Sequence, residues 1–200
     1  MGQTIGSVGD IIRVHGAERA GQTAVIQGER SLTWGELYTR SKKLSQALSA
    51  VGVKSESRVS FLDKNSVEHF EVFFACSLLN AVSVDVNWRL APPEVAYIVN
   101  DAESRVFIAH NEFRSVLDAI AGDLHPDSLV VIIGGDASPV GKLRTVAYED
   151  FLAGGSDTDP GAKGGAEDVA FQLYSSGTTG RPKGVMLTNN NFFALMPLAK

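Results

Sequence analysis

Short apolar segments with strand character alternate along this chain with segments whose apolar residues recur at helical spacing. Apolar runs bounded by turn residues predict strands, and apolar residues at i, i+3 and i+4 predict helices. The alternation predicts an α/β protein with a doubly wound sheet, parallel or mixed, flanked by helices. Strands are expected at residues 23–27, 31–32, 58–62, 81–86, 105–109 and 129–133, and helices at 34–51, 66–79, 92–100 and 112–121.

Residues that flank the periodic segments predict where the helices begin and end. Thr33 and Asn65 stand where a side-chain oxygen can accept a hydrogen bond from the first turn of a helix. Pro92 suits a first turn, because its missing N–H would have no partner there. Gly52 follows a helical segment, where a left-handed backbone conformation is common.

The last quarter of the chain changes character. Residues 153–167 are rich in Gly, Ser, Asp, Thr, Pro and Lys and nearly free of apolar side chains, which predicts a surface connection. We therefore expect an N-terminal α/β subdomain over 1–152 and a separate final part over 168–200. The elements expected in that final part are a strand at 169–174, a strand at 184–187 and a helix capped by Asn189 or Asn190.

Composition and charge narrow the class of protein. The chain has 200 residues, of which 44% are hydrophobic and 20% charged, and this is typical of a soluble globular protein. The net charge of −5 comes without a basic block interleaved with aromatic residues, so no nucleic-acid partner is expected. No apolar run approaches the roughly 20 residues of a membrane span, and the first residues lack the pattern of a secretory leader. A cytoplasmic protein without a membrane span is the expectation.

The cysteine and the histidines receive no chemical role. Cys76 is the only cysteine and lies in an apolar helical pattern, which favours a small buried side chain over a nucleophile. The four histidines are scattered, and none has a second metal-type ligand at helical or hairpin spacing. We therefore expect neither a metal site nor a catalytic side chain from these residues.

A loop crowded with hydroxyl and glycine residues lies between the two final strands. Residues 174–185 read Tyr-Ser-Ser-Gly-Thr-Thr-Gly-Arg-Pro-Lys-Gly-Val. Glycines allow backbone N–H groups to turn toward an anion, while hydroxyls and a lysine add donors and positive charge. The pattern predicts a polyphosphate ligand, and hence ATP. A Walker A loop is not formed, because Pro182 stands where that pattern requires glycine and Lys183 is followed by Gly184.

This loop closely resembles the signature of the acyl-adenylate-forming enzymes, Thr-Ser-Gly-Thr-Thr-Gly-x-Pro-Lys-Gly, and departs from it only at Ser175. Further similar segments are Leu-Thr-Trp-Gly-Glu-Leu at 32–37, Asn-Ser-Val-Glu at 65–68 and Asn-Trp-Arg-Leu-Ala-Pro-Pro-Glu at 87–94. The resemblance thus covers nearly the whole chain. It is nearest to bacterial acyl-CoA synthetases that act on fatty or aryl acids, with a fatty acid as the expected substrate.

Outside the loop, the chain departs from the family pattern at three further places. Asn189 stands where the family usually has histidine, which puts any role of that histidine in doubt. Asn80 replaces a glycine, and Ser-Glu-Ser-Arg at 55–58 replaces Lys-Gly-Asp-Arg. We interpret the last two as tolerated changes in turns.

The resemblance implies a two-step ligase reaction and a set of binding residues. An acid would react with ATP to give acyl-AMP, which then passes to coenzyme A, and Mg²⁺ would accompany the ATP. Coenzyme A would be contacted mainly by polypeptide outside this chain. Arg181, at a variable position of the signature, is expected to face solvent. The implied phosphate-binding residues are Ser175, Ser176, Thr178 and Thr179 through hydroxyls, Gly177 and Gly180 through the backbone, and Lys183 through its charge.

The family's adenine pocket, acyl pocket, acidic magnesium ligand and catalytic lysine find no counterpart in this sequence. We therefore expect the chain to be the N-terminal part of a longer enzyme, to bind nucleotide weakly alone and to be inactive alone. Apolar residues of the final segment are expected to favour self-association: Phe192, Phe193, Leu195 and Met196.

Three alternatives remain at the level of sequence. One is a fatty acyl-AMP ligase that hands its acyl group to a carrier protein, which this sequence does not separate from a CoA ligase. A second is a nonenzymatic interaction module that keeps the fold. A third, an unrelated nucleotide hydrolase or kinase, is disfavoured by the failed Walker A pattern and by the absence of kinase motifs.

Overall fold

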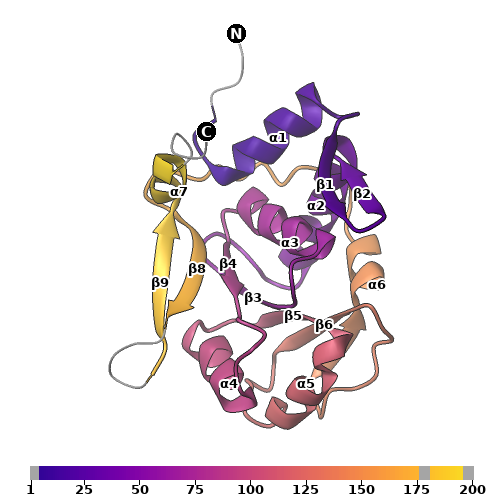
Figure 1. Ribbon diagram of the computed structural model, residues 1–200, viewed down its shortest axis with the longest axis vertical. Coiled ribbons are helices and arrows are strands. Elements are labelled where there is room, and N and C mark those ends of the chain that lie inside the picture. Colours follow the sequence, from indigo (N-terminus) through magenta and orange to yellow (C-terminus); the bar gives the residue numbers. More distant parts are fainter. Residues whose placement is uncertain (1–4, 176–180, 196–200) are drawn as a thin grey trace.

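The computed structural model describes residues 5–175 and 181–195 of the chain (Figure 1). Its centre is a seven-stranded sheet with the order β7-β6-β5-β3-β4-β8-β9. Every neighbouring pair is parallel except β8 and β9, which form an antiparallel hairpin at one edge. The predicted mixed, doubly wound sheet is therefore confirmed. The strands are β3 Arg58–Leu62, β4 Val82–Asp85, β5 Val106–His110, β6 Leu129–Ile133, β7 Arg144–Ala147, β8 Val169–Ser175 and β9 Lys183–Thr188.

Helices cover both faces of the sheet. On one face α2 (Trp34–Ala50), α3 (Val67–Leu78) and α6 (Tyr148–Ala153) pack against side chains such as Val59, Phe61 and Ile108. On the other face α4 (Pro92–Asp101) and α5 (Arg114–Ile120) pack against Leu62, Phe107 and Val130. Successive strand residues point to opposite faces, so strands buried on both sides need the nearly continuous apolar runs seen in the sequence.

Three smaller elements complete the fold. Helix α1 (Val8–Glu18) packs across α2 and α3, and β1 (Thr23–Gln27) pairs with β2 (Arg30–Thr33) as a separate antiparallel hairpin (Figure 1). A 3₁₀ turn, η1 (Asn111–Phe113), leads into α5, so the helix predicted at 112–121 begins as a tighter turn. Helix α7 (Asn189–Leu195) follows β9.

The predicted helix caps are right at α2 and wrong at α3. Thr33 and Glu36 form a reciprocal capping box at the start of α2. At α3 the capping residue is Ser66 and not Asn65, because the Ser66 hydroxyl accepts the His69 N–H at 3.3 Å. The sequence offered two adjacent capping residues, and only the backbone path selects between them.

The cap of α7 also differs from the prediction. Thr188 accepts the Asn191 N–H at 3.2 Å, while the Asn191 side chain accepts the Thr188 N–H at 3.1 Å. Asn190 lies inside the helix, and Asn189 is buried with other partners. Gly52, by contrast, has the expected left-handed conformation, with φ of +95° after α2.

The sequence analysis missed α1, β7 and α6. The start of α1 carried a usable signal, because Ser7 and Asp10 form a capping box. Strand β7 has four residues, exposed or half-buried, at the sheet edge, and α6 has only six residues. Elements this short have little periodicity of their own, so pairing with β6 and packing on the sheet decide their structure.

The Gly- and Asp-rich connection at 153–167 is bound to the body of the protein through Asp159. Arg13 donates to Asp159 through Nε at 2.8 Å and Nη2 at 2.9 Å, and the Tyr38 hydroxyl donates to it at 2.7 Å. Burial raises the pKa of Asp159, but hydrogen bonds from Arg13, Tyr38 and the Gly161 N–H outweigh it and lower the pKa to about 2. This carboxylate links the connection to α1 and α2.

An acid titration should reveal this link. The unfolded chain takes up a proton near the ordinary value of 3.8, whereas folded Asp159 does so only near 2, so stability should fall as the pH drops between these values. After allowance for solvent screening we expect this contribution to be about 1 to 2 kcal/mol. Asp159→Asn should lose it at neutral pH and flatten the dependence. Urea unfolding at several pH values measures this, with Asp118→Asn in the exposed Arg114 pair as the matched control.

Cys76 is fully buried, as predicted, and burial raises the pKa of its thiol. None of the helices in the described residues is long and apolar enough to cross a membrane.

Candidate functional site

The β8–β9 hairpin holds the two ends of the predicted phosphate loop. Ser175 ends β8 and Lys183 begins β9, and the antiparallel register pairs them directly. Both side chains are exposed. Directly opposed residues have Cβ atoms about 5 Å apart, so the Ser175 hydroxyl and the Lys183 side chain start from neighbouring positions on the two strands. The structure therefore brings together two of the seven predicted residues.

The other five predicted residues lie outside the described part of the chain: Ser176, Gly177, Thr178, Thr179 and Gly180. The structure gives the positions of the two flanking segments, β8 up to Ser175 and residues 181–188 with β9, which we call the two stems of the loop. Strand β8 runs parallel to β4, so the loop emerges at the carboxyl edge of the parallel strands. This is the edge at which α/β sheets bind ligands.

A network of polar side chains holds the end of strand β8, which leads into the predicted phosphate loop. The Tyr174 hydroxyl donates to Asp101 Oδ2 at 2.7 Å and accepts from Gln172 Nε2 at 3.0 Å. Burial and the neighbouring Asp101 carboxylate both raise the pKa of Tyr174, so the hydroxyl remains a donor at ordinary pH. Arg58 Nε donates to the side-chain oxygen Oε1 of Gln172 at 3.4 Å. Residues of β3, α4 and β8 thus meet under the loop.

Gly184, opposite Tyr174, has no room for a side chain. A Cβ at this position would lie 2.7 Å from Gln172 Nε2 and 3.3 Å from Cζ of the Tyr174 ring. A side chain here would push the Gln172 amide away from its bond with the Tyr174 hydroxyl, which gives a physical reason for the last glycine of the motif.

We expect Gly184→Ala to destabilise the protein by about 1 to 3 kcal/mol, because the added methyl group must displace Gln172 or Tyr174. Urea unfolding measures this directly. Gly122→Ala is the matched control, since a Cβ there meets nothing within 4 Å and the change should be nearly neutral. Equal unfolding midpoints for the two variants would contradict the steric explanation.

Arg181 is exposed, as expected from its variable position in the signature. Its guanidinium carbon lies 5.9 Å from the centre of the Tyr97 ring, within range of a cation–π contact. Tyr97 is on α4, so the second stem of the loop also meets this helix.

Asn189, which replaces the family's usual histidine, has a structural role. It is 3% exposed, and its Oδ1 accepts the Val8 N–H at 2.9 Å while its Nδ2 donates to the Gly165 carbonyl at 2.9 Å. The side chain joins α7 to the start of α1 and to the 153–167 connection.

At the other two departures, residues with side chains have a backbone conformation that favours glycine. Asn80 has φ of +55° and Glu56 has φ of +64°, both in the left-handed region that favours glycine. Asn80 Nδ2 also donates to Ser55 Oγ and to Asp168 Oδ2, each at 3.0 Å. These contacts agree with the interpretation as turn changes.

A crevice of about 710 Å³ opens at the carboxyl ends of β3, β5 and β6. The chain leaves β3 toward β4 on one side and returns as β5 on the other side, so this is the topological switch point of the sheet. The sequence did not predict this crevice, because its walls come from five separate segments. They include Gln27, Arg30, Asp63, Lys64, His110, Gly134, Gly135 and Glu149.

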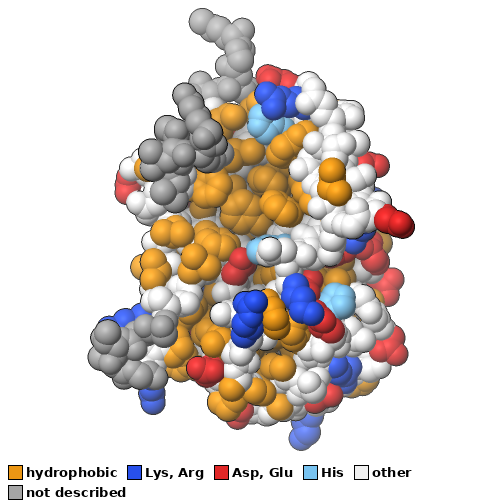
Figure 2. Space-filling model, viewed as in Figure 1, with side chains coloured by type: hydrophobic (Ala, Val, Ile, Leu, Met, Phe, Trp, Pro, Cys, Tyr) orange, Lys and Arg blue, Asp and Glu red, His pale blue; other side chains and the backbone are white. Residues whose placement is uncertain are grey.

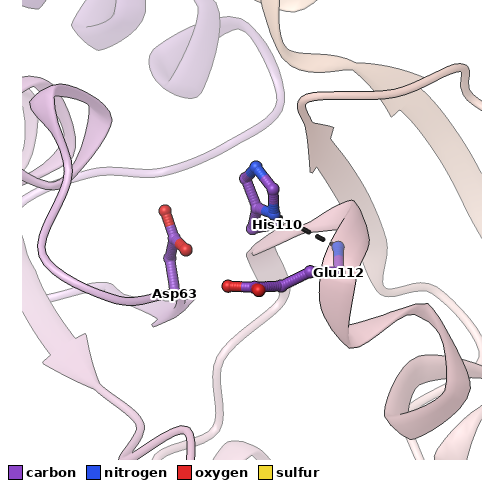
Figure 3. A group of neighbouring side chains, drawn as sticks. All are labelled: Asp63, His110 and Glu112. Atoms are coloured by element: carbon purple, nitrogen blue, oxygen red, sulfur yellow. Dashed lines mark hydrogen bonds between the residues drawn. The ribbon is translucent and has the colours of Figure 1, made fainter. Parts of the chain in front are cut away.

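Figure 3 shows Asp63, His110 and Glu112 facing one another in this crevice, with ligand-type atoms all within 4.8 Å. All three groups already have partners, and Asp63 Oδ1 accepts the Lys64 N–H at 2.7 Å. Glu112 accepts from Lys64 Nζ at 2.9 Å, and the Glu112 N–H donates to His110 Nδ1 at 3.1 Å. The sequence analysis gave His110 no chemistry, and tertiary structure supplies neighbours that spacing along the chain does not show. We assign no metal to this group.

Hydrophobic side chains gather over α3, between α1 and the β8–β9 hairpin, as Figure 2 shows. A hollow of about 190 Å³ lies among Phe70, Phe73, Phe171 and Phe192, with Phe70 45% exposed. Phe192 and Phe193 are half-buried against this region, whereas the Leu195 side chain and Met196 lie outside the description. Self-association through this face stays a prediction.

Together, the fold and the hairpin define a doubly wound α/β protein in which the two strands flanking the hydroxyl- and glycine-rich sequence end and begin at the carboxyl edge of the parallel sheet. Residues 12–199 match the AMP-binding enzyme family, and the chain belongs to that family.

Curated relatives are ligases of different acids. The chain is 39% identical over 167 residues to a 3-hydroxybenzoate–CoA ligase of Aromatoleum sp. (strain CIB), covering 84% of this chain and 31% of that protein. It is 35% identical over 173 residues to a fatty acid–[acyl-carrier-protein] ligase of Streptomyces coeruleorubidus, covering 86% and 31%. The chain thus spans about a third of the length of these relatives.

A solved structure has the same fold over nearly the whole chain. The anthranilate CoA ligase AuaEII, in complex with anthranoyl-AMP, superposes with a TM-score of 0.87 at 30% identity, covering 96% of this chain and 36% of that one. The similarity confirms the resemblance identified from the motifs and its N-terminal position within the family.

Proposed function

We propose that this chain forms the N-terminal part of an AMP-forming acid–thiol ligase, and that the β8–β9 hairpin binds the β- and γ-phosphates of ATP. The observation that carries the proposal is the register that sets Ser175 opposite Lys183 at the carboxyl edge of the sheet. It occurs in a chain matched over residues 12–199 by the AMP-binding family.

The first half-reaction forms a mixed anhydride. A carboxylate oxygen of the acid attacks the α-phosphorus of ATP, and the bond from that phosphorus to the oxygen bridging the α- and β-phosphates breaks. Acyl-AMP and pyrophosphate result, with the bond electrons on pyrophosphate. Catalysis of such transfers is mostly positioning and electrostatic stabilisation. A lysine beside the leaving group favours the transition state because it stabilises the charge that develops there.

In the second half-reaction a thiol attacks the acyl carbon and releases AMP. The thiol loses its proton and the AMP phosphate keeps the electrons of the broken bond. Coenzyme A and a carrier-protein thiol are both acceptors among the relatives, as the names of the two ligases show. We propose coenzyme A for this protein, with a carrier protein as the second candidate.

Mg²⁺ bound with ATP would neutralise part of the charge on the phosphates. The described stem fits such a complex, since Ser175 offers an exposed hydroxyl and Lys183 an exposed cation on adjacent strands. Ser175 would hold a phosphate oxygen or a water on the ion, and Lys183 would contact the phosphates directly.

For the acid substrate we propose only a chemical class. Relatives act on 3-hydroxybenzoate and on fatty acids at similar identity, so either an aryl or a fatty acid agrees with this region. We keep a fatty acid as the first candidate and an aryl acid as the second. We also propose that the isolated chain is inactive, because it spans about a third of its relatives.

ATP–pyrophosphate exchange tests the proposal. The complete protein encoded by the gene and this 200-residue chain would each be assayed with short, long and aromatic acids. Acid-dependent exchange in the complete protein alone supports both the ligase function and the inactivity of the isolated chain, and it names the acid class. Absence of exchange with every acid in both proteins would favour the nonenzymatic alternative.

A further inference from the structure

Helix α4 contacts the phosphate-loop hairpin on both sides of the loop. On the β8 side, the Tyr174 hydroxyl donates to Asp101 Oδ2 at 2.7 Å. On the β9 side, the Arg181 guanidinium lies over the Tyr97 ring, 5.9 Å from its centre. Both contacts reach the same helix, although Tyr174 and Arg181 belong to opposite stems.

The two helix residues are themselves connected. Tyr97 and Asp101 are one helical turn apart, and the Tyr97 hydroxyl donates to Asp101 Oδ1 at 3.3 Å. One carboxylate therefore accepts from both tyrosines, one oxygen each. Hydrogen bonds to a charged acceptor are stronger than bonds between neutral groups, so Asp101 is suited to hold both rings.

The rest of the network restricts Tyr174 further. Gln172 Nε2 donates to the Tyr174 hydroxyl at 3.0 Å, and the missing side chain of Gly184 leaves room for this amide. The hydroxyl thus donates once and accepts once, with α4 on one side and the sheet on the other. These two hydrogen bonds restrict the orientation of the Tyr174 ring as well as the position of its hydroxyl oxygen.

We propose that Tyr97 and Asp101 are positioning residues that hold the two stems of the phosphate loop at a fixed separation. This inference rests on the proposed function, since it concerns the use of the loop for ATP. Ser175 follows Tyr174 directly, and Arg181 stands two residues before Lys183, so both stem contacts lie beside the groups that face the phosphates. If either stem becomes less ordered, the Ser175 hydroxyl and the Lys183 ammonium group no longer keep a fixed position.

The first test is kinetic. In the complete protein, Tyr174→Phe should raise KM for ATP and lower kcat of adenylation, each by roughly fivefold to tenfold, because one bond to a charged acceptor is lost. Transfer from preformed acyl-AMP to the thiol should stay within about twofold, since it does not use the pyrophosphate-binding loop. Asp101→Ala should have a larger effect than Tyr174→Phe, because it releases both tyrosines.

Tyr38→Phe is the matched control. The Tyr38 hydroxyl also donates to an aspartate at 2.7 Å, and it is similarly half-buried, but its partner is Asp159 in the 153–167 connection, not a residue of α4. A general loss of stability would affect both variants, whereas positioning affects Tyr174→Phe alone. An equal KM for ATP in the two variants would overturn the inference.

A second measurement separates failure of this inference from failure of the proposed function. Trypsin can cleave after Lys183 but not efficiently after Arg181, because Pro182 follows it. Tyr174→Phe and Asp101→Ala should speed cleavage at Lys183 at least about threefold relative to Tyr38→Phe, because local opening sets the rate. An inactive wild-type protein with this cleavage pattern would leave the support by α4 intact and refute the ligase. Unchanged cleavage would refute the support by α4 in an active or inactive protein.

Discussion

Lys183→Ala in the complete protein should lower acid-dependent ATP–pyrophosphate exchange by about 30-fold to 1000-fold. This corresponds to about 2 to 4 kcal/mol of transition-state stabilisation, as expected when one preorganised charge-stabilising group is removed. Lys183 is exposed and stands opposite Ser175, and it has no ion pair with another described residue. Its charge is therefore available to a ligand, and its removal should leave the fold intact.

Two variants make this expectation specific. Lys183→Arg keeps the charge in a different shape and should recover part of the activity, because guanidinium and ammonium groups contact phosphate differently. Lys142→Ala removes an exposed lysine at the opposite edge of the sheet and should leave exchange unchanged. Pyrophosphate exchange measured at saturating acid, with ATP varied, separates kcat from KM. A loss below about threefold for Lys183→Ala would remove this lysine from the proposed site.

Arg40→Ala should lower the free energy of unfolding by about 3 to 5 kcal/mol, because it leaves a buried carboxylate without its charge partner. Glu71 on α3 is fully buried and accepts from Arg40 Nε at 2.6 Å and Nη2 at 3.1 Å. The Tyr148 hydroxyl donates to the same carboxylate at 2.7 Å, and Arg40 also contacts Glu149 at 2.6 Å. This network joins α2, α3 and α6 on one face of the sheet.

The loss of unfolding free energy in Arg40→Ala should change with pH in one direction. Burial raises the pKa of Glu71 above its ordinary value, while Arg40 and Tyr148 act in the opposite direction. Without Arg40 the folded carboxyl group binds a proton more readily than the unfolded one. Stability contributed by that proton is present at low pH and is lost as the pH rises through the folded pKa. The deficit of Arg40→Ala should therefore be smaller near pH 5 than near pH 8.

Urea unfolding measures both effects. The matched comparison is a triple variant, Arg40→Leu with Glu71→Leu and Tyr148→Phe, which removes the arginine, the buried carboxylate and the buried hydroxyl together and leaves only the exposed Glu149. Replacing a whole buried ionic group by apolar residues is often nearly neutral, so the triple variant should recover much of the stability. A triple variant less stable than Arg40→Ala would contradict the view that the uncompensated charge causes the loss.

Elements with strong local signals were predicted well from the sequence. The strands at 58–62 and 129–133 agree with the structure to the residue, because the first alternates between polar and apolar residues and the second is a continuous apolar run, as buried parallel strands require. The cap at Thr33 and the turn at Gly52 were also right, since each depends on one residue and its immediate neighbours. Helix α6 and strand β7 were missed because their contacts with the sheet, and not their own pattern, define them.

The candidate site divides in the same way. The motif identified the loop and its family, but the support under it could not be read from spacing. Asp101 and Tyr174 are 73 residues apart in sequence, and nothing local marks them as partners. The same holds for Asn189, whose replacement of histidine became interpretable only when its bonds to the Val8 N–H and the Gly165 carbonyl were seen.

The sequence by itself determined the α/β class and the family and predicted the residues of a phosphate loop, because periodicity, turn chemistry and an ordered motif are local properties of the chain. Only the tertiary structure decided the strand order, the switch-point crevice, the buried Glu71 network and the contacts of α4 with both loop stems. Those features join residues far apart in sequence, and their energies depend on burial and distance, which the folded chain alone defines.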